Sequence, residues 1–98
     1  MPLLHIALQD GFAGDPVSIT VDGREIFRKD RVRTMTQIGR ADDVETRHDA
    51  GPVSIDIKAR NSSSTITHTL AGDTFIGVSL TQDGRITHRI SQEAFRYM

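Results

Sequence analysis

Three of the four histidines, His48, His68 and His88, are the side chains best suited to hold a metal ion or move a proton. His68 and His88 each stand at the centre of an apolar–histidine–apolar pattern, in residues 66–70 and 86–90. Metal binding requires imidazole nitrogens at about 2.0–2.1 Å. In a simple meander an intervening strand would separate the two backbones by about 9.6 Å. We therefore expect each to be a partly buried histidine bonded to a neighbouring hydroxyl or carbonyl; a metal-assisted site built from His48, His68 and His88 is the alternative.

Basic side chains gather in residues 24–33, where five cations stand against two carboxylates: Arg24, Arg28, Lys29, Arg31 and Arg33 against Glu25 and Asp30. A phosphate or nucleic-acid binder that uses these arginines is a second alternative. However, β-scaffolds that bind nucleic acid combine such charge with exposed aromatic rings, and only Phe27 is nearby. Residues 42–49 are net acidic. We expect the two runs to pair with each other, within one chain or across a dimer, rather than to bind nucleic acid.

Composition excludes several kinds of site. The 98 residues contain no cysteine, which excludes disulfides, thiol catalysis and thiolate metal sites. The formal charge of −1 gives no general field that would attract nucleic acid. Sugar-binding sandwiches stack rings on tryptophan or tyrosine, and this chain has no tryptophan and one tyrosine. We find neither a nucleophile elbow nor a glycine-rich phosphate loop, and we expect no enzyme activity, no cofactor and no carbohydrate ligand.

The length of the chain predicts a single domain over residues 1–98. The amino terminus lacks the basic start and the long apolar segment of a signal peptide. Apolar stretches are only a few residues long, so we expect no membrane-spanning segment. The absence of cysteine favours a reducing compartment. We therefore expect a cytoplasmic protein.

Apolar residues alternate with polar ones in segment after segment, and a period of two is typical of half-buried β-strands. Seven to nine short strands separated by turn residues predict an all-β fold, a two-layer antiparallel β-sandwich. The side chains in phase on the best-patterned segments form the predicted core: Val53, Ile55, Ile57, Ile76, Val78 and Ile86. The serine-rich residues 61–64 have the composition of a flexible loop. Residues 32–48 fit either one helix or two strands, at 32–38 and 44–48, and their β-branched content favours the strands.

The turn pairs Asp10-Gly11 and Asp22-Gly23, the strand at 17–21 and the Gly51-Pro52 start of a long strand resemble small immunoglobulin-like or fibronectin-like sandwich domains. In particular, they are similar to stand-alone bacterial β-sandwich proteins of uncharacterised role, over nearly the whole chain. The cysteine pair and core tryptophan of true immunoglobulin domains are missing. The resemblance implies an interaction module.

Two of the five aromatic residues, Phe95 and Tyr97, lie in the carboxyl-terminal tail. Such a tail either folds back over an open end of the sandwich or docks on a second subunit. We expect a non-catalytic module that binds protein and forms a homodimer. Its candidate binding residues are Arg24, Arg28, Arg31, Arg33, Phe95 and Tyr97.

Overall fold

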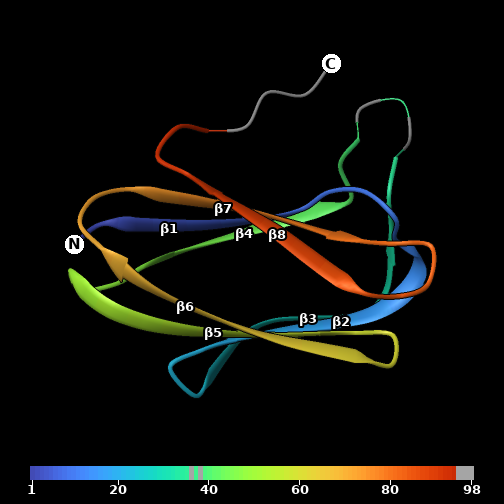
Figure 1. The fold of residues 1–98 in the computed structure, drawn as a ribbon, viewed down its shortest axis with the longest axis horizontal. Helices are drawn as coiled ribbons and strands as arrows, with labels where there is room; N and C mark the ends of the chain where they lie inside the picture. Colours follow the sequence, from blue (N-terminus) through green and yellow to red (C-terminus); the bar gives the residue numbers. More distant parts are fainter. Residues whose placement is uncertain (36, 38, 95–98) are drawn as a thin grey trace.

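The computed structural model describes residues 1–35, 37 and 39–94, and the regular structure in these residues is all β-strand (Figure 1). The strands, in chain order, are β1 (Leu3–Leu8), β2 (Ala13–Val21), β3 (Arg24–Arg33), β4 (Asp42–Arg47), β5 (Gly51–Ala59), β6 (Ser62–Leu70), β7 (Thr74–Leu80) and β8 (Ile86–Ser91). Asp22 and Gly23 form the turn between β2 and β3, with φ angles of 49° and 83°. Positive φ at both positions is what a two-residue hairpin turn requires. The all-β fold and the number of strands expected from the alternation are confirmed.

The strands form two four-stranded sheets that lie one above the other (Figure 1). Their orders are β4-β1-β7-β8 and β3-β2-β5-β6, with β3 and β4 on one side of the sandwich and β6 and β8 on the other. Five of the six pairings are antiparallel, but β1 and β7 are parallel. The two-layer sandwich is therefore confirmed, with one parallel pair that the alternation did not predict. The direction of β1 relative to β7 depends on how the chain crosses between sheets, which a local pattern does not encode.

The core lies between the two sheets and consists of the apolar face of each strand. The largest fully buried side chains are Leu4, Ile6, Leu8, Ile19, Ile55, Ile57, Leu70, Ile76 and Val78. Five of the six predicted core residues are at most 3% exposed. The sixth, Ile86, is only half-buried, because β8 is the last strand of its sheet and has a neighbour on one side alone.

Two segments differ from their expected structure. Residues 61–64 do not form a loop, because β6 begins at Ser62 and pairs with β5 from its first residue. Within the described residues, 32–48 contains no helix: β3 continues to Arg33, and β4 covers Asp42–Arg47. Met35 and Arg40 form a single bridge between them, while Ile38 lies outside the described residues. No described segment is a helix that could span a membrane.

Candidate functional site

The basic residues of the sequence analysis lie on β3, the last strand of its sheet. Arg24, Arg28, Arg31 and Arg33 are all exposed. Arg28 donates to Glu25 at 2.8 Å, and this hydrogen bond raises the pKa of the guanidinium. The nearby ring of Phe27 packs against the core and is half-buried. A base-stacking platform of the kind found on nucleic-acid-binding sheets therefore does not accompany these arginines.

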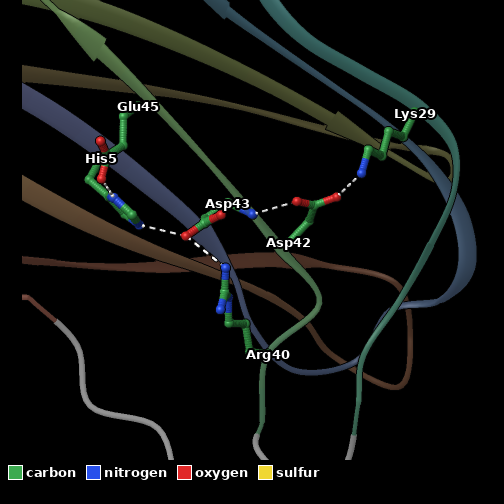
Figure 2. A network of polar contacts seen from close by, with 6 residues as sticks. All are labelled: His5, Lys29, Arg40, Asp42, Asp43 and Glu45. Carbon is green, nitrogen blue, oxygen red and sulfur yellow. Dashed lines mark hydrogen bonds and ion pairs between the residues drawn. The ribbon is translucent and has the colours of Figure 1, made fainter.

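The basic run and the acidic run contact each other within one chain. Figure 2 shows the side chains involved: His5, Lys29, Arg40, Asp42, Asp43 and Glu45. Lys29 on β3 pairs with Asp42 on β4 and so connects the two sheets. Asp43 lies between the imidazole of His5, at 3.3 Å, and the guanidinium of Arg40, at 2.9 Å. Part of the charge complementarity expected from the sequence is thus satisfied inside the molecule.

His5 is enclosed by acceptors, a feature that the sequence analysis did not single out. Its Nδ1 lies 2.7 Å from Glu45 and its Nε2 lies 3.3 Å from Asp43. The register of β1 with β4 places His5 directly opposite Glu45, and the ring also contacts Phe75, with the ring centroids 5.6 Å apart. Each ring nitrogen of His5 therefore lies beside a carboxylate of β4. This arrangement holds β4 against β1.

The three histidines proposed as metal ligands are separated by the fold. His68 lies on β6, opposite Val53 and half-buried, whereas His88 lies on β8 in the other sheet. The meander assumed for this pair is therefore wrong. His88 faces the same side as buried Val78, yet it is exposed because β8 is an edge strand. Among the described residues, no three His, Asp or Glu side chains are grouped so that they could hold a metal ion.

His48 forms a clasp between the β4–β5 connection and the β2–β3 turn. Its Nε2 lies 2.5 Å from Asp22, and its Nδ1 lies 2.8 Å from the carbonyl of Asp49. The carboxylate of Asp22 and then that carbonyl raise the pKa of His48. Asp22 also accepts from the amide of Ser54 at 2.9 Å, and this bond, followed by His48, lowers the pKa of Asp22. The clasp is a structural link that depends on pH.

Strand β6 is the longest edge strand of the described sheets that pairs without a register shift. It pairs with β5 along its full length, from Ser62 opposite Ala59 to Leu70 opposite Gly51, without a register shift. Its sequence contains neither a charged residue nor a proline. The side chains that face away from the core are all exposed hydroxyls: Ser63, Thr65, Thr67 and Thr69. Together with the core-facing positions, which are half-buried at Ser62, Ser64 and His68 and buried at Ile66 and Leu70, these residues define what we call the β6 edge, Ser62–Leu70.

The other three edge strands of the described sheets carry features that block pairing with another strand. Strand β3 is mostly charged and has three register shifts against β2. Strand β4 is only six residues long, mostly charged, and its Asp42 is bound to Lys29. Strand β8 is equally short and carries Arg89. The β6 edge is thus the one described edge that is long, neutral and regular.

A broad open depression of about 700 Å³ adjoins the β6 edge. It is lined by Asp22, Pro52, Val53, Ser54, Thr67, His68 and Thr69. The sequence analysis missed the β6 edge because its first residues, the serines of residues 61–64, have a loop composition. The alternation was nevertheless present, since Ser62 and Ser64 continue the inward phase of Ile66 and Leu70. The predicted binding residues Phe95 and Tyr97 lie outside the described residues.

No family model, no curated protein and no solved structure matches this chain, so the chemistry of its own surfaces carries the functional argument.

Proposed function

We propose that this domain is a non-catalytic protein-interaction module that binds an extended segment of its partner along the β6 edge. The observation that carries the proposal is the length, neutrality and unbroken register of β6. An edge strand with these properties is a template for a further strand. Main-chain hydrogen bonds to the added strand supply affinity, and alternate side chains supply selectivity.

The surroundings of β6 define the chemistry of the segment that would bind. The exposed row of hydroxyls favours β-branched and hydroxyl side chains in the added strand, because such cross-strand pairs are stabilising. The adjoining depression contains one charged residue, Asp22, whose carboxylate is already bound to His48 and the amide of Ser54. The partner segment is therefore neutral, extended and free of proline.

A fluorescent peptide with the sequence of Ser62–Leu70 tests the proposal directly. We expect anisotropy to rise on titration with the domain, and amide signals to shift at Ser63, Thr65, Thr67 and Thr69 of the isotopically labelled protein. A peptide with proline in place of Thr65 and Thr67 is the matched control, because it lacks the donors and should bind at least about tenfold more weakly. Shifts confined to β3 or β4, or no binding at millimolar domain, would contradict the proposal.

Anion binding through β3 is a second candidate function, favoured by a specific observation. Arg24, Arg31 and Arg33 are exposed, and their side chains make no ion pair with any described residue. Retention on heparin that falls steeply with salt, and falls further in an Arg31→Gln/Arg33→Gln variant, would support it. Elution at low salt by both proteins would exclude it.

A further inference from the structure

We propose that the occupant of the β6 edge is the β6 edge of a second copy of this chain. The two strands pair antiparallel about a two-fold axis at Ile66 and join two four-stranded sheets into one continuous sheet. This inference rests on the proposed function and names its partner.

The backbone of β6 has unused donors and acceptors at alternate residues. The turn between β5 and β6 leaves two residues, 60 and 61, between the paired Ala59 and Ser62. In a two-residue hairpin the flanking pair is hydrogen-bonded, and hydrogen-bonded pairs then alternate along the ladder. The amide and carbonyl groups that point away from β5 therefore belong to Ser63, Thr65, Thr67 and Thr69. None of these groups bonds to a described loop or turn.

The two-fold at Ile66 uses all of these groups. In this register Thr65 lies opposite Thr67 of the second copy, and Ser63 lies opposite Thr69. Both are pairs of outward-pointing backbone groups, so each pair can exchange two hydrogen bonds. The same register places hydroxyl side chains against hydroxyl side chains on the outer face, and it engages all of Ser62–Leu70.

Charge distribution favours self-pairing of β6 over self-pairing of β3 or of β4. Self-pairing of β3 over its full length would bring arginine opposite arginine, and self-pairing of β4 would join two strands that each contain three carboxylates and one arginine. Such like-charge neighbours are destabilising. The β6 edge contains no Asp, Glu, Lys or Arg, so its own sequence is a fitting partner.

An exposed apolar residue lies on the same side of the sandwich. Ile90 on β8 pairs with buried Ile76 and so faces the layer between the sheets, yet it is 39% exposed. A two-fold axis perpendicular to the joined sheet places both β8 strands on the same face, next to each other. The second copy then covers Ile90. Pairing of the two β6 strands by itself makes only a small interface. The contact at Ile90 adds apolar buried area to it.

Sedimentation velocity of the full chain tests the dimer. Between about 10 and about 500 µM protein we expect the mass to rise from that of the 10.9 kDa chain toward twice that value. Thr67→Pro removes only an outward amide, and Thr67→Lys adds a charge at the edge; each should weaken association at least about tenfold. Ile90→Ser should weaken it less. Thr20→Lys is the control, since Thr20 lies on an interior strand of the same sheet, between Glu25 and Asp56. The Thr20→Lys protein should associate like wild type.

Cross-linking tests the register, because the chain has no native cysteine. A mixture of Thr65→Cys and Thr67→Cys proteins should form a disulfide-linked dimer, whereas Ser63→Cys mixed with Thr67→Cys should not. A dimer insensitive to both Thr67 variants overturns the inference. A strict monomer also overturns it: if the monomer still binds the Ser62–Leu70 peptide, the edge accepts a foreign strand and the proposed function stands. If the monomer does not bind the peptide, the proposed function and the inferred dimer are both wrong.

Discussion

Among the eight glycines, Gly11 is the one at which an added Cβ would lie nearest to another backbone atom, and it gives a sharp test of the packing. Gly11 has a φ of +89°, and a Cβ added there would lie 1.8 Å from the carbonyl oxygen of Leu80. Gly23 has a φ of +83° and nothing within 4 Å of an added Cβ. Because the two φ angles are nearly equal, Gly11→Ala and Gly23→Ala share the same backbone strain. The difference between their losses in the free energy of unfolding therefore measures the clash with Leu80.

The expected loss in the free energy of unfolding follows from these distances. Left-handed φ costs an alanine about 1–2 kcal/mol at either position. At Gly11 the Leu80 backbone must also move by about 1.2 Å, the difference between the 3.0 Å that a Cβ tolerates and the 1.8 Å found here. That movement disrupts the 2.8 Å hydrogen bond from the amide of Leu80 to Asp10, worth about 0.5–1.5 kcal/mol, and loosens a buried leucine side chain. We expect Gly11→Ala to lose about 2 kcal/mol more than Gly23→Ala.

Urea unfolding followed by circular dichroism measures this difference. For a small protein the slope is about 1–3 kcal/mol per molar urea, so the two midpoints should differ by about 1 M. A Gly11→Ala chain that fails to fold while Gly23→Ala folds is the same result in a stronger form. Equal midpoints for the two variants would refute the close approach of Gly11 to Leu80.

Three further predictions concern the core and the ion pairs. Ile55→Ala should cost about 2–5 kcal/mol in urea unfolding, because Ile55 is fully buried; a loss below about 0.5 kcal/mol would show that the opposite face of β5 is buried. Asp15→Asn should destabilise less than Ile55→Ala, since it weakens the two contacts of 2.9 and 3.1 Å from a partly exposed Arg60; no change would mean that the pair is dispensable. The raised pKa of His48 means that its bond to Asp22 stabilises the fold fully below about pH 6.5 and loses this contribution as pH rises through the raised pKa. The urea midpoint should therefore fall more between pH 6 and pH 8.5 in wild type than in His48→Gln. An equal fall of the midpoint in the two proteins would show that the bond between His48 and Asp22 does not stabilise the fold.

Local sequence determined the strands and their buried faces. Alternation at Val53, Ile55 and Ile57 could be recognised because a strand that covers a core must place apolar side chains at every second position. The Asp22-Gly23 turn was equally readable, since it needs residues that tolerate positive φ. These features depend only on neighbouring residues, so they predicted an all-β sandwich without knowledge of the contacts.

Tertiary structure alone decided which strands became edges, and the candidate site depends on that choice. His68 and His88 share a sequence pattern, but β6 and β8 lie in different sheets, so their similarity does not bring them together. Ser62, Ser63 and Ser64 have the composition of a loop, yet pairing with β5 makes them the start of the β6 edge. An edge is defined by a missing neighbour, and that property belongs to the order of strands in the sheet rather than to the residues of the strand.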